Sequence, residues 1–145
     1  MEWQQGEFTI TTRQDDLDIE MIHGFLSTSY WAKGIPKAIV EKAIKNSLSF
    51  GVYHNGSQIG FGRAITDRAT FAYLADIFIL PEFRGRGLGK WLISCFLAHP
   101  ELQGLRRWLL ATSDAHGLYR QNGFGPLKKP ENFMEIIVPE LYQRK

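Results

Sequence analysis

The stretch from Tyr73 to Lys90 constrains the fold most, because its residue pattern changes twice along its length. Tyr73 to Leu80 is an almost unbroken apolar run rich in aromatic and β-branched residues, which is typical of a strand buried on both faces. A proline ends this run, and a glycine-rich turn with two arginines follows from Arg84 to Gly89. From Leu88 onward, apolar residues recur at helical spacing. The stretch therefore predicts a strand, a glycine turn and a helix in succession.

This layout suits a ligand that carries phosphate. Glycines let the backbone approach a ligand closely, and the first amides of a helix lack partners within the helix. Arg84 and Arg86 add charge-assisted donors. The P-loop motif does not fit, because Trp91 stands where Ser or Thr must bind magnesium. The dinucleotide-binding fingerprint also fails, because its third glycine would fall on Lys90 or Leu92.

The pattern that remains, Arg84-x-x-Gly87-x-Gly89 between a strand and a helix, resembles the coenzyme A pyrophosphate loop of the GNAT superfamily of N-acetyltransferases. A second stretch resembles the other GNAT signature, Ala-x-x-x-Tyr-x-x-x-Gly-Phe, and it follows a strand-like run from Trp108 to Ala111. The matching positions of this second stretch are Ala115, Tyr119, Gly123 and Phe124. The resemblance covers the chain from about Ser49 to Val138. Thr112 stands where many members carry an asparagine that holds the pantetheine arm, so we predict no such contact here.

Length and composition limit the class of protein. At 145 residues the chain is predicted to form a single domain, residues 1–145, and its net charge of +2 argues against nucleic-acid binding. The lone cysteine, Cys95, excludes an internal disulfide, and its place on an apolar helix stripe favours a buried hydrophobe over a nucleophile. No segment has transmembrane length and the N-terminus is too polar for a signal peptide. We therefore expect a soluble, cytoplasmic protein that does not bind membranes.

The segment before the central stretch predicts two helices and a hairpin. An opening strand lies within residues 7–13, and Asp15 or Asp16 is expected to cap the helix that follows. Pro36 suits the start of a second helix that ends near Asn46. Asn55-Gly56 then predicts a tight turn between strands at 48–53 and 58–66. Two glycines within the second of these strands indicate a bulge or a close backbone approach.

After the central stretch, His99-Pro100 ends the helix, and the strand at 108–111 is predicted to lie parallel to the strand before that helix. A short helix spans 115–121, and Gly123 is its expected left-handed terminator. A last pair of strands is expected from Phe124 onward and from Met134 to Val138. With the resemblance, these elements imply an α/β (α+β) protein of the GNAT fold. Its mixed, mostly antiparallel sheet would have about six or seven strands flanked by about four helices.

In the GNAT fold two central strands splay apart near the glycine turn, and the pantetheine arm of the coenzyme lies along the exposed edge of the first strand. By resemblance this edge is Ile77 to Ile79. Lys90, in the first helical turn, either touches a phosphate or is solvated. The implied coenzyme-binding positions are Ile77, Phe78, Ile79, Arg84, Gly85, Arg86, Gly87, Leu88, Gly89 and Lys90.

The resemblance implies acetyl transfer from acetyl-CoA to a primary amine by direct attack, with no metal and no covalent enzyme intermediate. It assigns Tyr119 as the acid for the leaving thiolate, and a phenol of pKa ~10 can serve a thiol of pKa ~8.5. Ala115, Leu118 and Tyr119 also share one helical face, so Tyr119 in the core is the alternative. Asp76 is the candidate base, because an aspartate in a buried strand needs a task or a partner. A structural carboxylate is the alternative.

Tyr30 and Trp31 lie in the loop between the first two predicted helices, which covers the acceptor side of the cleft in the GNAT fold. They either form an aromatic wall around an amine substrate or plug the core. We expect a small-molecule amine as the acceptor. An amine on a protein and a non-catalytic acyl-CoA-binding sensor are the alternatives. A homodimer is a further expectation, because GNAT proteins often dimerise.

Overall fold

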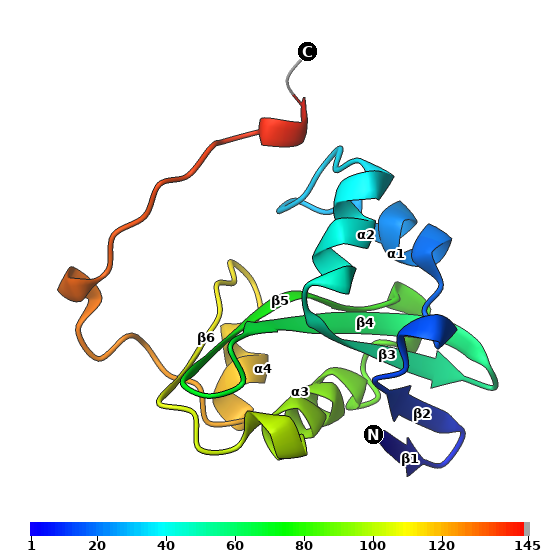
Figure 1. The fold of residues 1–145 in the computed structure, drawn as a ribbon. Coiled ribbons are helices and arrows are strands. Elements are labelled where there is room, and N and C mark those ends of the chain that lie inside the picture. Colours follow the sequence, from blue (N-terminus) through cyan, green and yellow to red (C-terminus); the bar gives the residue numbers. More distant parts are fainter. Residues whose placement is uncertain (144–145) are drawn as a thin grey trace.

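The computed structural model describes residues 1–143 and contains one six-stranded sheet in the order β1-β2-β3-β4-β5-β6 (Figure 1). Neighbouring strands are antiparallel except β5 and β6, which are parallel. The strands are β1 (Glu2–Gln5), β2 (Phe8–Thr11), β3 (Leu48–His54), β4 (Ser57–Thr66), β5 (Phe71–Ile79) and β6 (Arg107–Leu109). The helices are α1 (Ile19–Leu26), α2 (Lys37–Lys45), α3 (Leu88–Ala98) and α4 (His116–Gln121). The predicted α/β class and mixed sheet are confirmed.

Helices cover both faces of the sheet, and each face has its own hydrophobic cluster (Figure 1). On one face α1 and α2 bury Ile22, Leu26 and Val40 against Phe61 and Phe78 of the sheet. On the other face α3 packs against β2, β3 and β5, and the side chains buried there are Ile10, Phe50, Val52, Leu74, Leu92, Ile93 and Phe96. In the described part of the chain, no helix is both long enough and apolar enough to cross a membrane.

The predicted hairpin and parallel crossover are present. Asn55 (φ 50°) and Gly56 (φ 86°) both adopt left-handed conformations, as a two-residue hairpin turn between β3 and β4 requires. Pro36 precedes α2 and Asn46 ends it, as predicted. His99 ends α3, and the chain then returns to place β6 beside β5. Gly123 (φ 99°) follows α4 in the left-handed conformation, as predicted.

The strand predicted within residues 7–13 is present as β2, but the N-terminal prediction missed one strand and named the wrong helix cap. β1 precedes β2 and pairs with it around a left-handed Gly6 (φ 60°). Asp15 and Asp16 lie in a 3₁₀ turn, and the residue that caps α1 is Asp18, whose side chain accepts from the amide of Met21 at 3.1 Å. Several acidic residues precede the helix, so the sequence alone does not single out the one that caps it.

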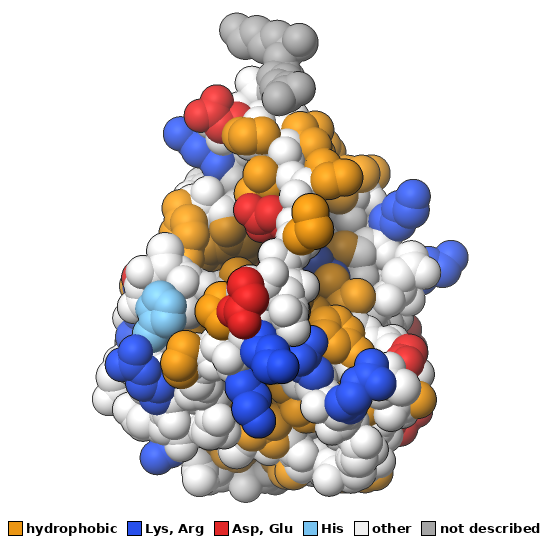
Figure 2. All heavy atoms as spheres, turned by 90° about the vertical axis from the view of Figure 1, so that its left-hand side faces the viewer, with side chains coloured by type: hydrophobic (Ala, Val, Ile, Leu, Met, Phe, Trp, Pro, Cys, Tyr) orange, Lys and Arg blue, Asp and Glu red, His pale blue; other side chains and the backbone are white. Residues whose placement is uncertain are grey.

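The predicted strands from Phe124 onward and at Met134 to Val138 are absent. Residues 124–143 contain only 3₁₀ turns, at Pro130–Asn132 and Leu141–Gln143. The chain here leaves the body of the molecule as an extended arm (Figure 1), and its apolar side chains face outward on the side shown in Figure 2. Met134 and Ile136 are each 98% exposed. The residue pattern suits a strand, but a strand also needs a neighbour to pair with, and no strand among residues 1–143 pairs with this segment.

Candidate active site

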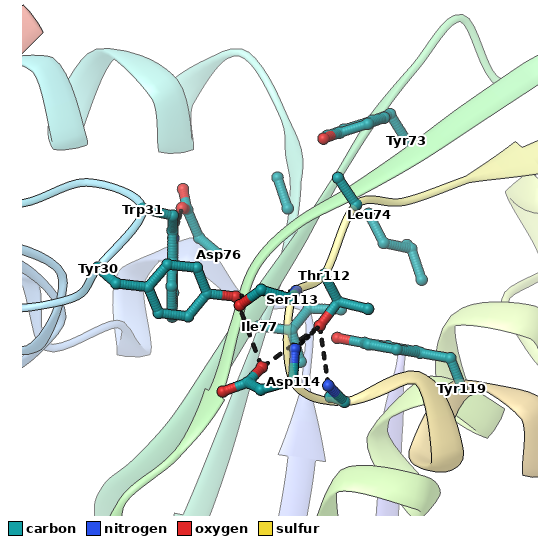
Figure 3. A pocket seen from close by; sticks show the side chains of 13 residues that line it. Tyr30, Trp31, Tyr73, Leu74, Asp76, Ile77, Thr112, Ser113, Asp114 and Tyr119 are labelled. Atoms are coloured by element: carbon teal, nitrogen blue, oxygen red, sulfur yellow. Dashed lines mark hydrogen bonds between the residues drawn. The ribbon is translucent and has the colours of Figure 1, made fainter. Parts of the chain in front are cut away.

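A cleft opens where β5 and β6 separate. The two strands pair only from Phe71 to Tyr73, although β5 continues to Ile79. Beyond Tyr73 the edge of β5 on this side therefore has no strand neighbour among residues 1–143. A cavity of about 360 Å³ lies at the separation (Figure 3). Its walls come from the loop between α1 and α2, from β5, from the segment after β6 and from α4.

Tyr73, Ala75, Asp76 and Ile77 are half-buried along β5 and line this cavity. The expectation of a strand buried on both faces was therefore wrong for this part of β5. These side chains line the cavity instead of packing against another layer, which explains the difference. Sequence reasoning missed Tyr73 as a lining residue. No local sequence signal marks it, because Tyr73 lies within an apolar run beside Ala72 and Leu74, which are buried.

β5 is distorted at Asp76, which adopts a left-handed conformation with φ 55°. The pairing of β4 with β5 shifts register between Phe61 and Arg63, which is a β-bulge. Gly62 lies opposite the bulge, and a Cβ there would sit 3.0 Å from Ile77 and 3.1 Å from the ring of Phe96. Left-handed backbone at a non-glycine residue costs on the order of 1–3 kcal/mol and is concentrated at functional sites. The predicted bulge thus lies beside the cleft and re-aims Asp76.

Both oxygens of the Asp76 carboxylate have partners. Oδ2 accepts from Nε of Arg63 at 2.8 Å, and Oδ1 accepts from Nε1 of Trp31 at 2.8 Å. The side chains of Arg63 and Asp76 are only 15% and 12% exposed. Arg63 also donates to Oγ of Ser47 at 3.0 Å. Asp76 therefore faces the cavity and at the same time ties the loop between α1 and α2 to the sheet.

Tyr30 and Trp31 do not plug the core, because they are 60% and 43% exposed. The Tyr30 hydroxyl donates to Asp114 at 3.5 Å and accepts from the amide of Ser113 at 3.3 Å. Trp31 packs edge-on against Tyr30 and bonds to Asp76 on the other side (Figure 3). The loop between α1 and α2 thus bridges the two separated strands and forms an aromatic wall at one end of the cavity.

Tyr119 on α4 is half-buried and lines the cavity opposite this wall (Figure 3). Its ring packs edge-on against Phe124. Burial raises the pKa of Tyr119 to about 12, and the neighbouring Tyr30 and Asp114 act in the same direction. The phenol therefore stays protonated at neutral pH and can donate a proton or a hydrogen bond into the cavity.

Thr112 has a local structural task. Its Oγ1 accepts from the amide of Ala115 at 3.1 Å at the entry to α4.

Cys95 is 2% exposed in the core, and burial raises the pKa of its thiol to about 12. A buried thiol that keeps its proton is a poor nucleophile.

The glycine turn precedes α3 as predicted. Gly85 and Gly87 both have φ 78°, and Gly87 is the residue before the first turn of the helix. This left-handed backbone conformation favours glycine at both positions. A Cβ at either position would meet no atom within 4 Å, so the space beside the turn is open. Packing does not require glycine at position 89, since a Cβ there would lie 3.4 Å from Leu118 of α4, which is an ordinary contact.

The basic residues of the turn are placed differently from one another. Nε of Arg84 donates to the carbonyl oxygen of Ile79 at 3.0 Å, which fixes the turn to the end of β5. The Arg86 guanidinium lies 5.4 Å from the ring centre of Phe83, and Lys90 is exposed.

Three of the predicted coenzyme-binding residues bury their side chains, namely Leu88, Phe78 and Ile79. These residues can therefore contact a ligand only through the backbone.

The open edge of β5 and the open turn before α3 are continuous along the chain and fit an extended ligand that ends in phosphate. Among residues 1–143, no cluster of three or more histidine, cysteine, aspartate or glutamate side chains is placed to hold a metal ion.

Comparison with known proteins gives the same result as the geometry. Residues 45–126 match the model of the acetyltransferase (GNAT) domain. The chain belongs to the GNAT family of acetyltransferases. The crystal structure of a Xanthomonas campestris pv. campestris protein assigned to this family is 53% identical, with a TM-score of 0.92 over 94% of this chain and 97% of that one. The GNAT assignment and fold predicted from the two signatures are therefore confirmed.

Two further relatives set the range of similarity within the GNAT family. The Gibberella zeae protein FG08082, which is named as an acetyltransferase, is 33% identical over 143 residues, or 83% of this chain and 80% of that protein. A GNAT family acetyltransferase from Elizabethkingia anophelis, solved with acetyl-CoA bound, shares the fold with a TM-score of 0.66. It is 15% identical and covers 92% of this chain and 90% of its own.

Proposed function

We propose that this GNAT protein is an acetyl-CoA-dependent N-acetyltransferase that acetylates a primary amine of a small molecule by direct attack. One observation carries the proposal: the cavity of about 360 Å³ at the β5–β6 separation brings together Asp76, Tyr119 and the aromatic wall. The edge of β5 leads from this cavity to the glycine turn before α3. The acetyl group of acetyl-CoA and the amine that accepts it would therefore meet between Asp76 and Tyr119.

Acetyl-CoA would bind mainly to backbone groups of the protein. The amides from Arg86 to Gly89 and the positive end of the α3 dipole suit its diphosphate. Ile77 to Ile79 lie along the edge of β5 that has no strand neighbour among residues 1–143, which suits the pantetheine arm, and the Ile79 carbonyl at its end accepts from Arg84. The guanidinium of Arg86 adds positive charge beside the turn, and Arg84 holds the turn against Ile79.

The reaction forms a bond between the amine nitrogen and the acetyl carbon, and it breaks the bond between that carbon and sulfur. The departing thiolate takes a proton, and Tyr119 is the donor because its phenol is protonated and aimed into the cavity. The amine must lose a proton, and Asp76 is the carboxylate at the cavity that can receive it directly or through water. Tyr30 and Trp31 form the apolar wall against which the acceptor stacks.

The pairing of Asp76 with Arg63 and Trp31 also favours a second candidate, an acyl-CoA-binding sensor without turnover. In such a protein the carboxylate would only hold the loop between α1 and α2. The two candidates differ in thiol release, because the sensor binds acetyl-CoA but releases no coenzyme A when amines are added.

The test measures acetyl-CoA binding by calorimetry and thiol release against a panel of amino acids, polyamines, amino sugars and arylamines. Amine-dependent release that Tyr119→Phe reduces supports the transferase. Binding with no release from any amine, or release that Tyr119→Phe leaves unchanged, contradicts the proposal as stated. A peptide with a free N-terminus and a lysine belongs in the panel. Selective acetylation of this peptide would identify a protein amine, and not a small molecule, as the acceptor.

A further inference from the structure

Charged side chains are unevenly distributed around the candidate active site. Among residues 1–143, the cavity of about 360 Å³ is lined by two acidic side chains, Asp76 and Asp114, and by no lysine, arginine or histidine. The remaining lining is apolar, hydroxyl-bearing or aromatic, and its aromatic members are Tyr30, Trp31, Tyr73 and Tyr119. A cavity of this composition favours a cationic ligand over an anionic one.

The two carboxylates differ in their partners. Asp76 is half-buried beside Arg63, whose Nε lies 2.8 Å from its Oδ2, so the charge of Asp76 is balanced within the protein. Asp114 is exposed, and its Oδ1 accepts long hydrogen bonds from the hydroxyls of Tyr30 at 3.5 Å and Thr112 at 3.4 Å. No lysine, arginine or histidine among residues 1–143 forms an ion pair with it. Asp114 therefore keeps its charge and its lone pairs for a ligand.

The aromatic wall connects the two carboxylates. The Tyr30 hydroxyl contacts Asp114, and the ring of Tyr30 packs edge-on against Trp31 with ring centres 5.0 Å apart (Figure 3). Trp31 in turn donates to Asp76. Aromatic rings attract ammonium groups over their faces. A cationic chain can therefore lie along this wall, with one end at Asp114 and the other beside Asp76 and Tyr119.

We propose that the acceptor is an aliphatic diamine or polyamine without acidic groups, and that Asp114 selects it by binding the ammonium group that does not react. This inference rests on the acetyltransferase function proposed above. The reacting nitrogen follows the bond changes given there, and the distal ammonium takes part in no bond making. An alkylammonium group has a pKa of ~10.4, so the distal group stays charged at neutral pH.

The same charges disfavour other amines. An amino acid, or an amine that carries a phosphate, would bring an anion towards Asp114 without a lysine or arginine in the cavity to offset it. An amine with one nitrogen can enter, but when that nitrogen reacts, Asp114 is left without a counter-charge. Two cationic groups on one chain therefore suit the cavity best.

Three probes that differ only at the distal end test the charge preference. They are 1,4-diaminobutane, 4-aminobutan-1-ol and 4-aminobutanoate, whose distal groups are positive, neutral and negative. In thiol-release assays with acetyl-CoA, kcat/KM for the diamine should exceed that for the alcohol about tenfold, as expected for one charged hydrogen bond, and the carboxylate should be the poorest acceptor. The corresponding compounds with six carbons repeat the test at a longer spacing.

Substitutions at Asp114 assign the preference to this residue. Asp114→Asn keeps the shape of the side chain and should lower the diamine-to-alcohol ratio of kcat/KM about tenfold, mainly by raising the KM for the diamine. Asp114→Lys should reverse the order, so that 4-aminobutanoate becomes a better acceptor than 1,4-diaminobutane. Asp15→Asn is the matched control, because it makes the same change at an exposed aspartate outside the cavity and should keep the wild-type ratio. A wild-type protein without a preference for the diamine at either chain length, or an unchanged ratio in Asp114→Asn, overturns the proposal.

Calorimetry with coenzyme A bound separates this inference from the acetyltransferase function, because coenzyme A has no acetyl group to transfer. The diamine should bind more tightly than the alcohol, and Asp114→Asn should weaken the binding of the diamine about tenfold. Binding of this kind without thiol release from acetyl-CoA would contradict the transferase function and leave the selectivity of the cavity in place. A diamine that binds no more tightly than the alcohol overturns the selectivity, even if other amines support turnover.

Discussion

Asp76→Asn separates the structural task of this carboxylate from the catalytic task proposed for it. Asparagine has nearly the same shape, tolerates the left-handed backbone at φ 55°, and keeps an oxygen that can accept from Trp31. Its amide nitrogen must then face Nε of Arg63, so two donors oppose each other and a guanidinium that is 15% exposed loses its counter-charge. The substitution therefore removes one interaction while leaving the rest of the site in place.

The cost follows from the burial of the pair. Removing one partner of a buried ion pair costs about 3–5 kcal/mol, because the other charge is left uncompensated. Arg63 keeps its bond to Ser47 and retains some contact with water, so we expect a loss of roughly 2–4 kcal/mol in the free energy of unfolding. In a chain of this length, that loss lowers Tm by roughly 5–15 °C.

Urea unfolding of Asp76→Asn, of Arg63→Met and of the double variant measures the coupling between the two side chains. The double variant should regain part of the loss, because no buried charge is left alone. Equal unfolding midpoints for Asp76→Asn and the wild-type protein would refute the reasoning about the pair. In thiol-release assays at a temperature where every variant is folded, the double variant should remain slow if Asp76 accepts the amine proton. Recovery of turnover together with stability would make Asp76 a positioning residue only.

The other predictions concern single side chains. Tyr119→Phe should lower kcat by about 10²–10⁴-fold while acetyl-CoA affinity in calorimetry is retained, as expected for loss of a general acid. Tyr53→Phe removes a buried hydroxyl that has no hydrogen-bond partner among residues 1–143, and it should stabilise the protein by about 1 kcal/mol in urea unfolding. Burial raises the pKa of Tyr53 from 10.0 to about 12, so between these pH values the folded state keeps a proton that the unfolded chain loses. The free energy of unfolding should therefore fall as the pH rises from 10 to 12, and it should fall less steeply in Tyr53→Phe. Gly87→Ala, at φ 78°, should cost about 1–2 kcal/mol and weaken acetyl-CoA binding, whereas Gly117→Ala within α4 should do neither.

Local patterns predicted the parts of the fold that depend on local chemistry. Asn55-Gly56 determines its turn because both residues must be left-handed, and the spacing of apolar residues after Gly87 identifies α3. Asp76 and Tyr119 line the cavity and were among the residues proposed, since Asp76 stands out in an apolar strand and Tyr119 lies within a specific signature. Their catalytic roles stay predictions, because geometry shows where they lie and not what they do.

Features that depend on distant partners were not predictable. Residues 134–138 are rich in apolar and β-branched side chains, as strands are, but pairing depends on a neighbour elsewhere in the chain, and no described strand pairs with them. The bond from Trp31 to Asp76 joins side chains 45 positions apart, and no local signal connects them. Tyr30 meets Ser113 and Asp114 across a still longer separation.

The bulge at Asp76 links these distant features. A regular β5 would aim successive side chains to alternate faces, and the left-handed residue breaks that alternation. As a result, the carboxylate can meet Arg63 within the sheet and Trp31 above it at the point where β6 has already ended. The loop between α1 and α2, which carries Trp31, is held on the far side of the cleft by Tyr30. The position of this loop therefore depends on both β5 and β6. The strain at Asp76 is therefore offset by bonds that fix the aromatic wall. For this reason we expect substitutions in Trp31 and Asp76 to have non-additive effects on the KM of the proposed amine acceptor.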